Sequence, residues 1–271
     1  MSESPPVSSP VVQYFANQVK RLRNEKGLTQ DQLGKRIGYT GAMVGYVENA
    51  KRIPTEKFIL GCDEQLDAGG VLNELWPLIN RESYPDWFRP FVELEAEAIS
   101  LRAFEVQVVP GLFQTEAYAR AVLSAGWPPP KADDVERQLS ARLERQKILD
   151  RDNPPLLWAV LEESVVRRPV GGRSAMAEQL KYLLEISQRP HVRVQVLPFA
   201  NGVHAAMDGA FEVLEMGARE KVLYVERPGG GHIISDATEV AKCDQRMSAL
   251  VGLALSPEES AELITTSIGD L

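Results

Sequence analysis

The sequence predicts a multidomain protein, with an all-α domain of five helices over residues 11–80 and an α+β domain over residues 84–271 that holds an antiparallel or mixed sheet. At about 150 residues per domain, a length of 271 residues indicates two domains. Apolar residues have helical spacing throughout the front part of the chain. Apart from one extended stretch at 106–112, the short β-type runs bounded by turn signals begin near residue 156. Residues 1–10 are expected to be disordered.

The front domain opens with two predicted helices. Residues 10–26 carry apolar side chains at steps of three and four and end at Gly27. A second helix begins after Thr29, whose hydroxyl can cap it while Gln32 reaches back to complete a capping box, and it ends at Gly38. The inward side chains of the second helix are expected to be Leu33 and Ile37. The basic outer face of the first helix is expected to hold Lys20, Arg21 and Arg23.

Three more helices are expected to complete this domain. Thr40 can cap a short helix that buries Val44 and Val47. The outward positions of that helix are expected to be Gly41, Ala42, Tyr46 and Asn49. Thr55 can cap a fourth helix, and residues 71–79 form a fifth in which Val71 helps to close the bundle.

The second domain mixes helices and strands. Asp236 and Ser256 have the pattern of helix N-caps, and Gly229 to Gly231 are expected to form a hairpin turn. The earlier predicted helices span residues 91–102, 115–124, 134–151 and 174–187, and the predicted extended segments span 106–112, 156–167, 192–197, 210–215, 222–226 and 232–235.

Composition excludes several classes of protein. With 44% hydrophobic and 25% charged residues the chain is ordinary globular, and its longest apolar run, residues 156–161, is far shorter than the roughly 20 residues of a membrane helix. The segment 1–10 has no basic flank or apolar stretch of a secretory signal, so we expect a cytoplasmic protein. The two cysteines and three histidines lack the short spacings of a metal site, so we expect no metal and no cofactor.

Charge is unevenly distributed along the chain. Residues 11–57 hold nine basic and four acidic side chains, although the whole protein has a net charge of −8. A local basic excess on an acidic protein favours contact with a polyanion, and a solvated helix face is the alternative. This observation singles out the front domain as a candidate nucleic-acid-binding domain.

Residues 28–54 resemble the helix-turn-helix of the XRE family, to which phage lambda-type repressors also belong. The resemblance is carried by Gly27 to Gln30, Leu33, Ile37, Gly38 to Thr40, Val44, Val47 to Asn49, Arg52 and Pro54. It implies that the helix opened by Thr40 enters the major groove of double-stranded DNA, which is wide enough for a helix, and that the protein acts as a homodimer on paired half-sites.

The resemblance implies a role for each candidate DNA-binding residue. Gln30, at the start of the preceding helix, is expected to bond phosphate or to brace the reading helix. Phosphate contacts, which position the protein without reading sequence, are expected from Lys35, Arg36, Lys51 and Arg52. Base contacts are expected from Thr40, Gly41, Ala42, Tyr46 and Asn49.

Two positions in this motif are expected to cost stability. Gly34 lies in a helix interior, where glycine costs roughly 0.5 to 1 kcal/mol. Ala50 follows the third helix, where a left-handed turn would be strained for any residue with a Cβ atom.

Residues 84–265 resemble an uncharacterised domain found behind XRE-type helix-turn-helix domains in many actinobacterial regulators. The resemblance lies in 91–97, 102–105, 109–115, 142–146, 167–172 and 194–199. Some of those regulators are paired with a small protein encoded next door and are classed as antitoxin-like. For this chain the resemblance implies a regulatory domain that senses a ligand or binds a protein partner.

Catalysis is not expected. The chain contains no nucleophile elbow, no zinc-protease helix motif and no phosphate-binding loop. Two acid-base pairs could be assembled from the sequence, His204 with Asp208 and Glu162 with Glu163, but no motif supports either of them. Unsupported pairs of this kind are usually surface residues or core residues with satisfied hydrogen bonds. We therefore expect a transcriptional regulator and not an enzyme. The alternatives are a protein-interaction adaptor with a degenerate helix-turn-helix, or an enzyme tethered to DNA.

Overall fold

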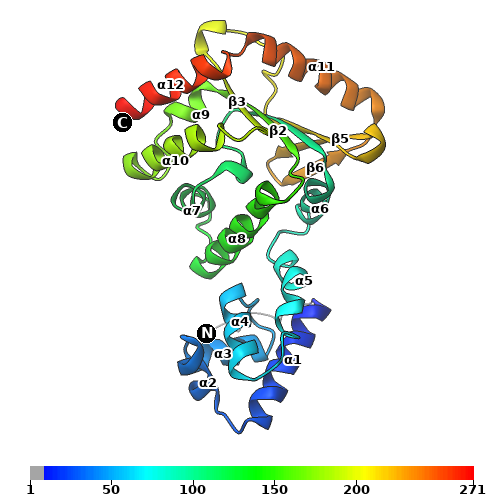
Figure 1. Cartoon of the computed structure of the whole chain (residues 1–271), viewed down its shortest axis with the longest axis vertical. Helices are drawn as coiled ribbons and strands as arrows, with labels where there is room; N and C mark the ends of the chain where they lie inside the picture. Colours follow the sequence, from blue (N-terminus) through cyan, green and yellow to red (C-terminus); the bar gives the residue numbers. More distant parts are fainter. Residues whose placement is uncertain (1–8) are drawn as a thin grey trace. The chain divides into compact units, whose positions relative to one another are not determined.

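The computed structural model describes residues 9–271 and divides the chain into two compact units, Met1–Pro85 and Asp86–Leu271. Most of the segment expected to be disordered therefore lies outside the described residues. The class is the one that the sequence predicts: a helical front unit and an α+β unit with a mixed sheet. Figure 1 shows the order of the elements in each unit.

The front unit is a helical bundle around one apolar core. Its helices are α1 (Pro10–Glu25), α2 (Gln30–Ile37), α3 (Gly41–Glu48), α4 (Glu56–Gln65), the short 3-10 helix η1 (Asn73–Leu75) and α5 (Trp76–Arg81). Thr29 accepts from Gln32 N in the predicted capping box, and Thr55 accepts from Phe58 N at α4. The prediction for residues 71–79 is wrong in part, because Val71 is half exposed and regular helix begins only at Trp76.

The second unit is a six-stranded mixed sheet with helices on both faces. The strand order is β3-β2-β1-β4-β5-β6. Strands β1, β2 and β3 are parallel. Strand β4 pairs antiparallel with β1, β5 with β4, and β6 with β5. The strands are β1 (Ser100–Glu105), β2 (Leu156–Glu162), β3 (Val192–Leu197), β4 (Phe211–Glu215), β5 (Lys221–Arg227) and β6 (Gly230–Ile234). The predicted hairpin is present, but its turn lies at residues 228–229, and Gly230 and Gly231, which were expected in the turn, belong to β6.

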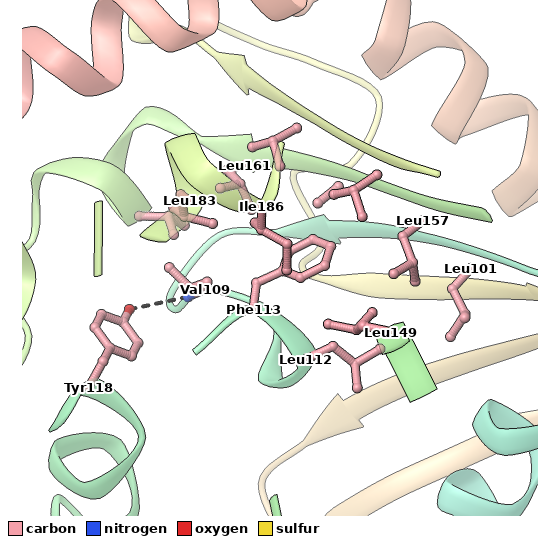
Figure 2. Close-up of a cluster of buried hydrophobic side chains, with 14 of the residues drawn as sticks. Leu101, Val109, Leu112, Phe113, Tyr118, Leu149, Leu157, Leu161, Leu183 and Ile186 are labelled. Carbon is pink, nitrogen blue, oxygen red and sulfur yellow. Dashed lines mark hydrogen bonds between the residues drawn. The ribbon is translucent and has the colours of Figure 1, made fainter. Parts of the chain in front are cut away.

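The helices of this unit form two layers. The long α11 packs on one face of the sheet, with Val240 and Met247 beside Phe104 and Val213. The other face carries the remaining helices, and Figure 2 shows part of their core, where Val109 N donates to Tyr118 Oη at 3.1 Å. The helices are α6 (Arg89–Glu97), α7 (Glu116–Ser124), α8 (Ala132–Arg145), α9 (Glu163–Arg167), α10 (Arg173–Ile186), α11 (Ala237–Leu253) and α12 (Pro257–Gly269), with 3-10 turns η2 (Gly111–Phe113), η3 (Gln146–Asp150), η4 (Phe199–Asn201) and η5 (Gly217–Arg219).

Three sequence-based boundaries are wrong. The predicted helix 91–102 ends at Glu97 and is followed by β1, so the extended segment lies at 100–105 and not at 106–112. The apolar spacing of α6 runs on into the strand, with no glycine or proline between them to mark the change. The predicted strand 156–167 ends at Glu162, where α9 begins, and the predicted helix 134–151 narrows to a 3-10 turn after Arg145.

One edge of the sheet is covered by the end of the chain. Val192 N donates to Arg189 O at 3.0 Å, and Val196 N donates to Ser260 Oγ at 2.9 Å. Leu255 N donates back to Val196 O at 2.9 Å. The loop before α12 and the first turn of that helix therefore bind backbone groups on the free side of β3.

Candidate nucleic-acid interface

The turn between α2 and α3 depends on glycine at two positions. Gly38 ends α2 with φ of +77°, which glycine adopts without steric cost. A Cβ atom at Gly34 would lie 2.8 Å from the carbonyl carbon of Thr40 and from the carbonyl oxygen of Tyr39, so only glycine lets the turn cross α2 this closely. The expected cost of Gly34 in a helix interior is therefore balanced by a close approach that alanine would block.

A buried ion pair anchors α3 to α1 and α2. Arg23 Nε donates to Glu48 Oε1 at 2.5 Å and its Nη2 donates to Oε2 at 2.9 Å, while Gln30 Nε2 donates to Oε2 at 2.8 Å. The Glu48 side chain is completely buried, and its hydrogen bond raises the pKa of Arg23. Arg23 also donates to Leu28 O at 2.6 Å, so one guanidinium links three elements.

The ion pair shows that the expected position of Arg23 is wrong and which of two expected roles Gln30 has. Arg23 lies on the buried side of α1 and not on its outer face. Gln30 braces α3 through Glu48, which is the second of the two roles expected for it. The sequence contained a signal for the pair, because Glu48 follows Val44 by four residues and Arg23 follows Val19 by four, which places both charges on apolar stripes.

The exposed face of α3 holds three of the five positions expected to contact bases. Ala42, Tyr46 and Asn49 are exposed, at spacings of four and three residues, with Tyr46 at 51%. The Asn49 side chain donates to Gly45 O at 2.7 Å, within its own helix. These three positions form the candidate reading face, and the opposite face of α3 is buried.

The remaining two base-contact positions lie at the helix start. Thr40 is exposed, and its hydroxyl accepts from Met43 N at 3.2 Å, which caps α3 as predicted. Gly41 is buried, so the expectation that it faces outward is wrong. A Cβ atom there would overlap the Asp31 side chain on α2. Gly41 therefore serves the packing of α2 against α3.

The four expected phosphate-contacting residues lie on both sides of α3 in the sequence. Lys35 and Arg36 are exposed in the last turn of α2. Lys51 and Arg52 are half-buried in the turn after α3, where Ala50 has a left-handed φ of +50°. The strained turn expected at Ala50 is confirmed.

The acid-base pairs considered in the second unit are rearranged. His204 Nε2 lies 3.6 Å from Glu162 Oε1, whereas Asp208 pairs with Arg246 at 2.8 Å. Glu163 pairs with Arg167 at 2.5 Å and accepts from Phe199 N at 2.8 Å. The two pairs that were considered from the sequence and set aside are therefore replaced by other partners.

Two capped helices, a tight glycine turn and an exposed helix face define the front unit as a helix-turn-helix DNA-binding domain. Residues 15–76 match the family model of a helix-turn-helix domain. Residues 88–266 match the model described as Domain of unknown function (DUF5753), and since that match covers more than half of the chain, the protein belongs to this family. No curated protein and no solved structure matches the chain. Within residues 9–271, no helix is long and apolar enough to cross a membrane.

Proposed function

We propose that the chain is a sequence-specific transcriptional regulator of the XRE type, in which the exposed face of α3 reads bases in the major groove of double-stranded DNA. The observation that carries the proposal is the reading face of Ala42, Tyr46 and Asn49, exposed on a helix whose other side is anchored through Glu48. A fixed helix with small and aromatic exposed residues suits contacts to thymine methyl groups and base edges. The protein would then work in the cytoplasm, on chromosomal DNA.

The second unit is proposed to regulate DNA binding and to support a homodimer. One reading helix covers only half of a site, and proteins of this class gain affinity by pairing half-sites about one helical turn apart. The acidic second part of the chain is a poor second DNA surface and suits a ligand or a small protein partner, as in antitoxin-like regulators. The proposal assigns it no catalytic step.

The test is genome-wide footprinting with the tagged full chain, followed by binding assays on the recovered sites at several salt concentrations. Tyr46→Ala should change which sequences are preferred, at a cost of about 1 to 3 kcal/mol of discrimination. Arg36→Ala should weaken binding equally on all sequences and lower the salt slope by roughly one.

Lys20→Ala is the matched control, because this exposed basic residue lies on α1, outside the helix-turn-helix. Absence of any footprint and of salt-dependent binding would favour a protein-interaction adaptor. A folded Tyr46→Ala variant with unchanged site preference would show that α3 is not the reading helix.

A further inference from the structure

The second unit contains a cavity of about 330 Å³ between α6, α8 and the sheet. Its wall includes Phe91 from α6, Arg142 and Arg145 from α8, and residues of β1, β4 and β5. The volume lies within the usual range for small-molecule sites, roughly 300 to 1,000 Å³. Taking about 30 Å³ for each water molecule, it holds about ten waters or an organic molecule of similar size.

Three carboxylates from the sheet line this cavity, and a fourth, Asp208, is paired with Arg246. Glu212 on β4 is paired in register with Tyr224 on β5, and Glu226 follows two residues later on the same face. Tyr224 Oη donates to Glu226 at 2.8 Å. The third carboxylate, Glu105, comes from the end of β1.

Two of these carboxylates have no direct contact with a donor or a cation in the part of the chain that the structure describes, although the charge of Arg145 acts on Glu212 from a distance. Among the described residues, no hydrogen bond or ion pair is formed by the side chains of Glu105 and Glu212. Burial raises the pKa of Glu105 well above its ordinary value, and the neighbouring Glu212 and Glu226 raise it further. Both residues are partly exposed to the cavity, and a carboxylate that is largely removed from water without a donor or a cation is costly, so both groups favour the protonated form.

The cationic side chains of the cavity are engaged elsewhere. Arg145 Nε lies 3.1 Å from Glu95 Oε2, and its guanidinium lies over the Phe88 ring at 5.0 Å from the centroid. Arg142 Nη1 donates to Gln114 Oε1 at 2.5 Å. The positive charges of Arg142 and Arg145 are therefore already partly balanced by other groups of the protein. A ligand in the cavity would mainly meet the carboxyl groups.

The remaining wall is aromatic, and Gly231 makes room for one of its rings. Phe91 stacks on Tyr224 with ring centroids 4.0 Å apart. A Cβ atom at Gly231 would overlap the Tyr224 phenol, and one at Gly111 would overlap the Arg145 guanidinium. Gly231 therefore leaves the room that the Tyr224 ring occupies, whereas at Gly111 the overlapping atom is the movable end of the long Arg145 side chain.

We propose that this cavity binds a small organic cation, a protonated amine with an apolar body of about ten heavy atoms, whose ammonium group is held by Glu105 and Glu212. The apolar body lies along the aromatic wall, where a cation also gains from the faces of aromatic rings. This inference deepens the ligand-sensing part of the proposed function and rests on it for its regulatory meaning, but the binding itself is measured without DNA.

The test is ligand-observed NMR on the full chain with three matched fragment sets. The sets share the same aryl and alkyl bodies and end in an amine, an alcohol or a carboxylate. We expect amines to dominate the hits. Their dissociation constants should rise at least tenfold in Glu105→Gln and in Glu212→Gln, and stay unchanged in Glu215→Gln, which alters a carboxylate of β4 that does not line the cavity. Urea unfolding of each variant establishes that it is folded.

Three outcomes would overturn the proposal: hits dominated by carboxylates, which would assign the cavity to an anion held by the arginines; no hits with folded protein; or amine binding that neither glutamine variant weakens. The proposed function fails separately. Amine binding that leaves operator affinity unchanged would overturn ligand sensing and leave the amine site standing.

Discussion

Glu48 is the residue on which the position of the reading helix depends most. Its carboxylate accepts from Arg23 twice and from Gln30 once, and its side chain is fully buried. Glu48→Ala leaves the guanidinium of Arg23, only 10% exposed, without its carboxylate. Breaking a buried pair by removing one partner costs about 3 to 5 kcal/mol, so we expect the free energy of unfolding of the front unit to fall by that amount.

A double variant separates the cost of an orphaned charge from the value of the pair itself. Replacing both members by apolar residues of similar volume is often neutral or stabilising. Arg23→Met with Glu48→Leu is therefore expected to recover at least about 2 kcal/mol relative to Glu48→Ala. The exposed pair of Arg21 with Glu25 is the matched control, and Glu25→Ala should cost less than about 1 kcal/mol.

The assay is urea unfolding of the full chain, followed by hydrogen exchange in peptides from each unit, so that loss of the front unit is seen by itself. Operator affinity is measured in parallel, and we expect Glu48→Ala to lower it. A Glu48→Ala variant within 1 kcal/mol of the parent protein, or a double variant no more stable than Glu48→Ala, would refute the reasoning.

Three further predictions concern single residues. Gly34→Ala should destabilise the front unit by about 1 to 3 kcal/mol through contact with the turn backbone, whereas Gly252→Ala, in open space on α11, should be neutral or stabilising by up to about 1 kcal/mol in the same unfolding assay. Ala50→Gly should stabilise by about 1 kcal/mol, because it relieves a left-handed φ, and a lower melting temperature would contradict this. Burial raises the pKa of Glu212 from 4.5 to about 8, so its contribution to stability is full below pH 4.5 and is lost as the pH rises to 8. The free energy of unfolding of Glu212→Gln should therefore equal that of the parent protein near pH 5 and exceed it at pH 9 by on the order of 3 kcal/mol, a value reduced because the carboxyl faces a cavity. Equal pH profiles of the two proteins in urea unfolding would exclude this.

The front unit follows closely from local sequence rules. Thr29, Thr40 and Thr55 each cap the helix that they were expected to cap, since a hydroxyl one residue before an apolar-periodic segment binds the free N–H groups of the first turn. The buried and exposed sides of α3 also follow from its period of 3.6 residues, except at Gly41.

The second unit shows what local rules cannot supply. β1 is a central strand, paired with β2 on one side and with β4 on the other, and these pairings are distant in sequence. Likewise, Arg145 lies in the helix predicted over residues 134–151, where basic and acidic side chains alternate as on a solvated helix face, yet its side chain is 7% exposed beside Glu95. Whether such a charge is buried is decided by the elements packed on it, which the spacing within its own helix does not reveal.

The covered edge of β3 limits how copies of this protein can join. An open sheet recruits new strands only through unpaired backbone groups at its edges. At β3, the amides of Val192 and Val196 and the carbonyl of Val196 are already bound by Arg189, Ser260 and Leu255. Strand addition there would require the chain end to detach first. If copies of this protein join by extending the sheet, they are therefore expected to pair through β6, the strand at the opposite edge.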